Sequence, residues 1–141
     1  MKKILFTLAI VISGLAVAQQ SKSPLVILDG SITSESFMKH IDTRKIESVN
    51  IYKNSIPDYL KGFEGARTNG IIDIKMKENP YDKISLAELN TQYKLPANNP
   101  VSFDGQLLKD TKMTVIANAI TSMKVNQLEG REVLFLDTTP N

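Results

Sequence analysis

Two short apolar runs that each end in an Asp-Gly pair constrain the fold more than any other feature of this sequence. The first run is "PLVILDG" at residues 24–30, and the second is "NPVSFDG" at residues 99–105. Asp-Gly favours a tight turn, because glycine adopts positive φ without strain and aspartate hydrogen-bonds to nearby backbone. Leu25–Leu28 is uninterrupted, which predicts a strand covered on both faces. The expected turn residues are Asp29, Gly30, Asp104 and Gly105.

A second pair of similar segments follows, one after each Asp-Gly pair and at a similar distance along the chain. "IESVNIY" begins at Ile46, and "ITSMKVN" begins at Ile120. The likeness predicts two related β-α-β-β units at residues 24–78 and 99–138, the second shortened, with a linker at residues 79–98 that holds a short helix. Asp-Gly and Ile-x-Ser are common in proteins, so a chance resemblance between the two units is the alternative.

The spacing of apolar residues predicts an α+β fold, with small mixed sheets and short helices against them. The expected helical segments are residues 33–42, 57–63 and 85–89, and the expected strands are residues 25–28, 46–53, 71–77 and 132–138. Ser85 and Glu88 have the spacing of a capping box at the start of the linker helix. In the strand at residues 71–77, Asp73, Lys75 and Lys77 are expected on a solvated face that limits edge pairing.

The N-terminus has the features of a secretory signal peptide over residues 1–18. Lys2 and Lys3 precede a continuous apolar run, and Ala16–Ala18 has the small-x-small pattern of a cleavage site. The apolar run is shorter than the roughly 20 residues that cross a bilayer comfortably, and a retained N-terminal anchor is the alternative. We therefore expect an exported protein.

Composition limits the chemistry that the chain can perform. It has 141 residues, of which 17 are basic and 15 acidic, and it has no cysteine. Loss of Lys2 and Lys3 with the signal peptide would balance the charges, and no basic cluster predicts nucleic-acid binding. The lack of cysteine excludes a disulfide scaffold, a thiolate metal site and a cysteine nucleophile. A single histidine cannot supply the usual zinc ligands, so we expect no metal and no cofactor.

Candidate catalytic residues are few, and each has a simpler interpretation. His40 is close to Asp42 and could form a base with it, but a lone histidine on a short polar helix is usually solvated. The aspartates of the two Asp-Gly pairs could act with Glu35 and Asp110 in glycosidase-type chemistry. Both aspartates precede glycine, so turn formation explains them better. The sequence therefore predicts that the protein is not an enzyme.

Three blocks occur in order in the first unit: "PLVILDG", "IDTRKIESVNIYKN" and "GARTNGIIDIKMK". In order and spacing they resemble the plug domain of TonB-dependent outer-membrane receptors, in the form common in Bacteroidetes-type proteins. The likeness departs from the family at Phe63 and Glu64, where the family usually has Tyr-Gly. The residues after Glu78 are too few for a receptor barrel, whose strands need about 9–11 residues each. We therefore expect a free-standing, plug-like module without its barrel.

The resemblance implies a non-catalytic binding module in the periplasm or at the outer membrane of a Gram-negative bacterium, associated with TonB-dependent transport. Loops on a rigid sheet often carry binding function, which makes the loop at residues 59–69 the expected contact surface. The candidate binding residues are Tyr59, Phe63, Glu64, Arg67 and Asn69. An ordinary solvated loop is the alternative. Gly65 and Gly70 are expected to form turns, and because Asn69-Gly70 leads into a strand rather than a helix, a phosphate-binding loop is disfavoured.

The expected partner is a protein at the outer membrane, for which a barrel is one candidate. A nutrient ligand is also compatible with the resemblance, whereas nucleic acid is not expected. The alternative function is that of a periplasmic structural or regulatory adaptor, which would pair with another protein through its strand edges.

Overall fold

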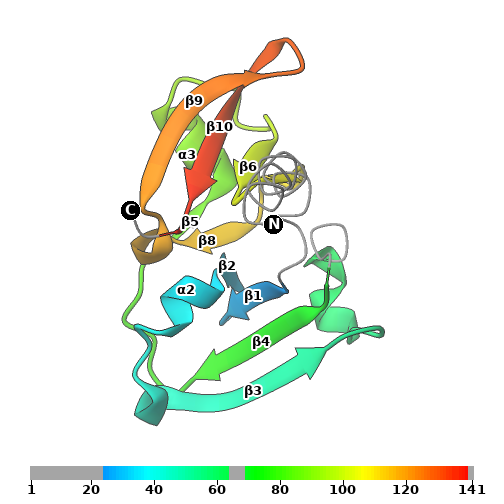
Figure 1. Ribbon diagram of the computed structural model, residues 1–141, viewed down its shortest axis with the longest axis vertical. Helices are drawn as coiled ribbons and strands as arrows, with labels where there is room; N and C mark the ends of the chain where they lie inside the picture. Colours follow the sequence, from blue (N-terminus) through cyan, green and yellow to red (C-terminus); the bar gives the residue numbers. More distant parts are fainter. Residues whose placement is uncertain (1–23, 64–68, 140–141) are drawn as a thin grey trace, which may run out of the picture.

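The part of the chain that the structure describes forms two mixed β-sheets with short helices between and beside them (Figure 1). The computed structural model describes residues 24–63 and 69–139, and the predicted α+β fold class is confirmed. The predicted signal peptide at residues 1–18 lies outside these residues. Within the described ranges, no helix is long and apolar enough to cross a membrane.

Most of the elements are short. The first sheet contains β1 (Leu25–Leu28), β2 (Ser31–Thr33), β3 (Ile46–Tyr52), β4 (Ile71–Met76), β5 (Lys83–Ser85) and β8 (Thr114–Ile116), in the order β3-β4-β1-β2-β8-β5. The second sheet contains β6 (Val101–Phe103), β7 (Gln106–Leu108), β9 (Ser122–Leu128) and β10 (Arg131–Asp137), in the order β7-β6-β10-β9. The helical elements are α2 (Glu35–Met38), η2 (Thr43–Lys45), η3 (Asp58–Phe63), α3 (Leu86–Gln92) and η4 (Ala117–Ala119).

The two halves of the chain contain the same four-stranded arrangement. β1 pairs antiparallel with β2 and parallel with β4, and β4 pairs antiparallel with β3. In the second sheet, β6 pairs antiparallel with β7 and parallel with β10, and β10 pairs antiparallel with β9. These strands follow one another along the chain in the same order as their counterparts in the first sheet. The second unit has β8 and η4 where the first has α2 and η2, and β8 joins the first sheet beside β2. The two predicted units are therefore interlocked, and their common origin stays a prediction.

The aspartate of the first Asp-Gly turn fastens the end of β4. The Asp29 backbone N–H donates to the Ile74 carbonyl at 2.9 Å, and its Oδ1 accepts from the Met76 N–H at 3.1 Å. The second carboxylate oxygen accepts from Asn79 Nδ2 at 2.8 Å. The predicted turn residue thus also sets where the parallel strand ends.

The second Asp-Gly turn repeats this contact on β10. The Asp104 backbone N–H donates to the Leu136 carbonyl at 2.9 Å. Its Oδ1 accepts from the Thr138 N–H at 2.8 Å, and its Oδ2 accepts from the Thr138 hydroxyl at 2.5 Å. Both hydrogen bonds to the carboxylate are partly buried. Hydrogen bonds to ionised groups are stronger than hydrogen bonds between neutral groups.

The main core lies where the two sheets and α3 meet. α3 begins at a complete capping box, in which the Ser85 side chain accepts from the Glu88 N–H at 3.1 Å and the Glu88 carboxylate accepts from the Ser85 N–H at 3.3 Å. The buried side chains of this core are Leu25, Ile27, Ile32, Ile56, Leu60, Ile71, Leu86, Leu89, Val101, Phe103, Leu108, Val115, Leu134 and Leu136.

A second cluster of buried side chains covers the other face of the first sheet. Val26 and Leu28 of β1 and Ile74 of β4 contribute to it, and Phe37 and Ile41 from α2 and the residues after it pack on them. β1 is consequently buried along its whole length, as its uninterrupted apolar run predicts.

β4 does not have the solvated face that its alternating residues predict. It lies between β3 and β1, so it is not an edge strand. Asp73 has an exposed fraction of 0 %, and Lys75 is half-buried, whereas Lys77 lies beyond the strand and is exposed. The prediction is wrong because period-two alternation identifies the two faces of a strand but not what covers each face. Here η3 and the residues before it pack over the polar face, with Leu60 in the same core as Ile71.

Replacement of Asp104 tests how much the turn carboxylate contributes. We expect Asp104→Ala to lower the free energy of unfolding by about 2–3 kcal/mol, because the Thr138 N–H and hydroxyl lose a charged acceptor and alanine tolerates the positive φ of this residue poorly. Asp104→Asn keeps one carbonyl oxygen and should lose markedly less. Urea unfolding measures both variants, and an equal loss in both would contradict the assigned role of Oδ1.

Replacement of Gly70 tests the close approach of β3 and β4. Gly70 has φ +89°, and a Cβ there would lie 2.7 Å from the Tyr52 carbonyl oxygen. Gly30 is the matched control, because its φ is +84° but a Cβ would meet nothing within 4 Å. We expect Gly30→Ala to cost about 1 kcal/mol of stability and Gly70→Ala at least about 1 kcal/mol more. Equal costs in chemical denaturation would show that the contact with Tyr52 relaxes freely.

Candidate functional site

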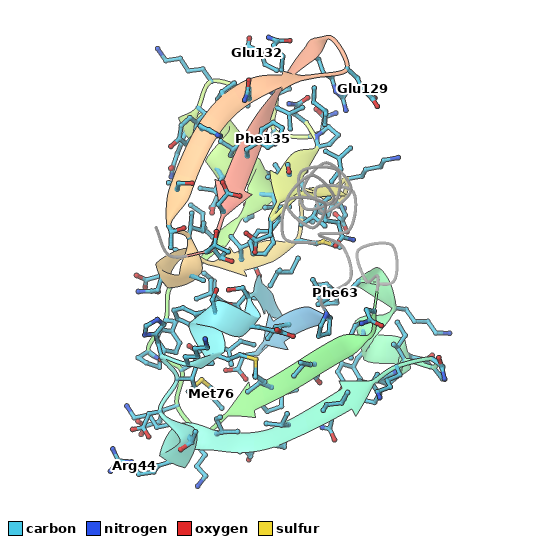
Figure 2. The ribbon with its side chains drawn as sticks, viewed as in Figure 1. Arg44, Phe63, Met76, Glu129, Glu132 and Phe135 are labelled. Carbon is cyan, nitrogen blue, oxygen red and sulfur yellow. The ribbon has the colours of Figure 1, made fainter. Side chains whose placement is uncertain are left out.

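The structure describes three of the five predicted binding residues. Tyr59 lies in η3 and is 57 % exposed. Phe63, at the end of η3, is half-buried and packs against the main core on the side toward β1 (Figure 2). Asn69 is exposed, one residue before Gly70. The predicted binding residues Glu64 and Arg67, and the predicted turn residue Gly65, lie outside the described residues.

Tyr59 belongs to a group of four side chains that we call the Tyr59 cluster: Tyr52, Tyr59, Asp73 and Lys75. The Tyr59 hydroxyl donates to Asp73 Oδ2 at 2.7 Å, and the Tyr52 hydroxyl lies 3.4 Å from the Tyr59 hydroxyl. The Lys75 Nζ atom lies 4.0 Å from Asp73 Oδ1 and 5.2 Å from the centroid of the Tyr59 ring, a cation–π distance. The cluster therefore joins an aromatic surface to a charged pair.

The paired strands β3 and β4 supply the base of the cluster. Asn50 pairs with Asp73, and the strand register places Tyr52, Asp73 and Lys75 on the same face of the sheet. η3 brings Tyr59 over this face, and η3 itself is anchored by Leu60, which is buried in the main core. The exposed ring of Tyr59 thus rests on a rigid support.

Burial of Asp73 makes the contact with Tyr59 energetically important. The side chain is fully buried, and its Oδ1 atom has no hydrogen-bond partner among the described residues. A buried carboxylate needs compensation for its lost hydration. The Tyr59 hydroxyl and the nearby Lys75 ammonium provide it here. Because the carboxylate depends on this donor, the Tyr59 side chain is held in one orientation.

The same contacts keep Tyr59 protonated. Its hydrogen bond with the Tyr52 hydroxyl, followed by its hydrogen bond to Asp73, raises the pKa of Tyr59 above that of an ordinary phenol. Partial desolvation and the negative charge of Asp73 act in the same direction. At physiological pH the residue is therefore a neutral hydrogen-bond donor and cannot serve as a general base.

The potential catalytic residues are not assembled into a site. His40 is exposed, and the Asp42 carboxylate is held by Arg44, with Nε to Oδ1 at 3.1 Å and Nη2 to Oδ2 at 3.0 Å. The hydrogen bond from Arg44 lowers the pKa of Asp42. Within residues 24–63 and 69–139, no group of three or more histidine, aspartate or glutamate side chains could hold a metal ion.

Sequence reasoning identified Tyr59 but missed the other three members of its cluster. Asp73 carried the strongest available signal, since it stands between two isoleucines in a strand and aspartate is unfavourable in strands. An aspartate kept in such a position needs a specific partner. Which tyrosine and which lysine reach it depends on the fold of η3 over β4, and no local pattern encodes that contact.

Comparison of the chain with protein-family models, with curated proteins and with solved structures gives no match. The resemblance to the plug domain therefore remains a prediction from the three sequence blocks.

A pH titration tests the environment of Tyr59. The chain has four tyrosines, and an ordinary phenol ionises near pH 10. We expect absorbance at 295 nm to show one phenol that ionises later than that, and Tyr59→Phe should remove this late component. Because folding raises the pKa of Tyr59, the stabilisation from its hydrogen bonds is present below about pH 10 and is lost as the pH rises through the folded pKa. Loss of a component near pH 10 in Tyr59→Phe would contradict the assignment.

Proposed function

We propose that the protein is a non-catalytic, exported binding module that recognises a protein partner at the outer membrane and acts in TonB-dependent transport. The observation that carries the proposal is Tyr59, which is 57 % exposed although its hydroxyl is fixed by a buried carboxylate. The resemblance to plug domains supports the location and the transport process, and the Tyr59 cluster supports the mode of binding.

A fixed, exposed tyrosine is well suited to protein recognition. Tyrosine is enriched among the residues that dominate binding energy at interfaces, because its ring offers apolar area and its hydroxyl a polar group. A side chain that is already ordered loses little conformational entropy when a partner binds. Lys75 places a positive charge beside the ring, and its side chain is still partly exposed. A partner surface with an apolar or aromatic group next to a carboxylate would match this arrangement.

The catalytic alternative has little support from the described residues. Tyr59 is held in its neutral form, and the Asp73 carboxylate is buried and turned toward Tyr59 and Lys75. General acid–base chemistry needs a group that exchanges protons near neutral pH and can reach a substrate. Tyr59 does not exchange its proton near neutral pH, and the buried Asp73 cannot reach a substrate, which favours recognition over turnover.

Site-specific photo-crosslinking in living cells tests the proposal. Tyr59 is replaced by p-benzoylphenylalanine, and Met123, an exposed residue of β9 in the other sheet, is replaced in the same way as the matched control. We expect the probe at residue 59 to capture an outer-membrane barrel protein and the probe at residue 123 not to do so. Capture of only soluble periplasmic proteins, or of the same proteins from both positions, would contradict the proposal.

Two substitutions of Tyr59 separate the ring from the hydroxyl. In pull-down of the captured partner, we expect Tyr59→Ala to weaken binding at least about tenfold, as for other interface hot spots, and Tyr59→Phe to weaken it less. Phe63→Ala is not a suitable probe of binding, because Phe63 packs against the core and its loss would also destabilise the fold. Thermal melting of each variant shows whether a loss of binding reflects unfolding, and unchanged binding by folded Tyr59→Ala would exclude this residue from the interface.

A further inference from the structure

β3 is an edge strand without the usual protection. Sheet edges expose unpaired N–H and C=O groups, and proteins guard them with short strands, charged side chains or proline. Among the described strands, the edges β5 and β7 have three residues each, and the longer edge strand β9 carries Lys124. In β3 the bulge between Ile46 and Ser48 distorts only the start, and the segment 48–52 contains neither a charge nor a proline.

The same strand exposes apolar side chains on one face. Val49 is 48 % exposed and Ile51 is 64 % exposed, and they pair with Ile74 and Ile72 of β4. Ile74 is fully buried, and Ile72 is partly buried. The apolar surface of the sheet therefore continues to its open edge instead of ending before it. Large apolar side chains beside unpaired backbone groups are typical of a surface that another strand covers.

We propose that β3 pairs antiparallel with β3 of a second copy of the chain, with Asn50 opposite Asn50 on a twofold axis. A twofold axis perpendicular to the sheet keeps every side chain on its own face. In this register Val49 lies opposite Ile51 of the second copy, and Ser48 lies opposite Tyr52. Two Val49–Ile51 pairs then close the apolar strip across the seam, because a twofold interface uses the same surface of both copies.

The charges that flank the segment select this register. Glu47 and Lys53 are both exposed, and centring the pair on Asn50 brings Glu47 of each copy next to Lys53 of the other. Centring on Val49 would set Ile51 opposite Glu47, and centring on Ile51 would set Val49 opposite Lys53. Each of these shifts places a charge against an apolar side chain. The segment is therefore self-complementary in both hydrophobicity and charge only about Asn50.

Strand β9 offers no such match. Centred on Val125, it would place Met123 opposite Gln127 and Lys124 opposite Asn126, so that neither the apolar residue nor the charge gains a complementary partner. Centred on Lys124, it would pair Met123 with Val125 but set the two lysine side chains opposite each other, which is destabilising. β9 has the same length and the same edge position as β3, which makes it the internal control for the proposal.

The dimer goes beyond the proposed function and does not depend on it. The Tyr59 cluster includes Tyr52, which points to the face opposite Val49 and Ile51. Pairing through β3 would therefore leave both clusters on one face of a continuous sheet. A surface with two identical contact sites could bind a repeated partner more tightly than one site does, by raising the effective concentration of the second contact.

Cysteine substitution tests the pairing and its register at once, because the chain has no cysteine of its own. Directly opposite residues of antiparallel strands have Cα atoms about 4.5–5.5 Å apart, within the range that a disulfide spans. We expect purified Asn50→Cys protein to form a disulfide-linked dimer under mild oxidation. Val49→Cys and Ile51→Cys should each crosslink poorly when tested alone, because the same residue in the two copies lies diagonally across the seam, about 7–8 Å apart or farther. A mixture of the two variants should crosslink, because residue 49 of one copy lies opposite residue 51 of the other.

A variant of β9 and a non-covalent assay complete the test. Asn126→Cys reports random collision and should stay monomeric. In sedimentation of the cysteine-free protein, Ile51→Lys should raise the dissociation constant of the dimer at least about tenfold, because two apolar side chains lose their burial. Met123→Lys on β9 should leave it unchanged, and circular dichroism confirms that each variant is folded.

Three results would overturn the proposal. The first is a monomer at every concentration together with no excess of Asn50→Cys dimer over Asn126→Cys dimer. The second is equal self-crosslinking by Val49→Cys and Asn50→Cys. The third is a dimer that Ile51→Lys does not weaken. All of these measurements use the purified protein alone, so they are independent of capture of an outer-membrane partner.

Discussion

The rest of the structure depends on the hydrogen bonds that join the ends of β4 and β10 to the two turn aspartates. Asp29 accepts from the Met76 N–H, and Asp104 accepts from the Thr138 N–H, 47 and 34 residues later in the chain. Parallel neighbours cannot be joined by a tight turn, so the returning strand needs another determinant of its position. A carboxylate placed directly after the first strand meets that need, and the chain uses it twice with the same atoms.

The position of β4 determines both surfaces that we assign to recognition. Because Asp29 fixes the end of β4, Asp73 lies beneath η3 and can hold the exposed Tyr59 ring. β4 also supports β3, whose Val49 and Ile51 extend the apolar surface to the open edge on the opposite face. One pair of strands thus presents a polar, aromatic surface on one side and an apolar seam on the other. Neither surface requires a catalytic group.

The predictions that hold depend on contacts between residues close in sequence, and those that fail depend on contacts between distant parts of the chain. The Asp-Gly turns and the capping box at Ser85 depend on residues close in sequence, and they are where the pattern places them. Asp73 was expected in solvent and Phe63 at a contact surface, yet the first is buried and the second packs on the core. The error at Asp73 arises from η3, whose position over β4 depends on distant packing, whereas the binding role of Phe63 stays a prediction. Tyr59 was found from its place in a loop, but not the carboxylate that orders it.

The most direct measurement of the central claim is amide hydrogen exchange of the tagged protein, alone and bound to components captured from detergent-solubilised outer membranes. Exchange reports which backbone amides become protected, even when the partner is unidentified. If Tyr59 forms the contact surface, peptides that cover η3 gain protection in the bound sample, while peptides that cover β9 exchange at the same rate as in the free protein. Protection confined to β9 and β10, or no change at η3, would contradict the account.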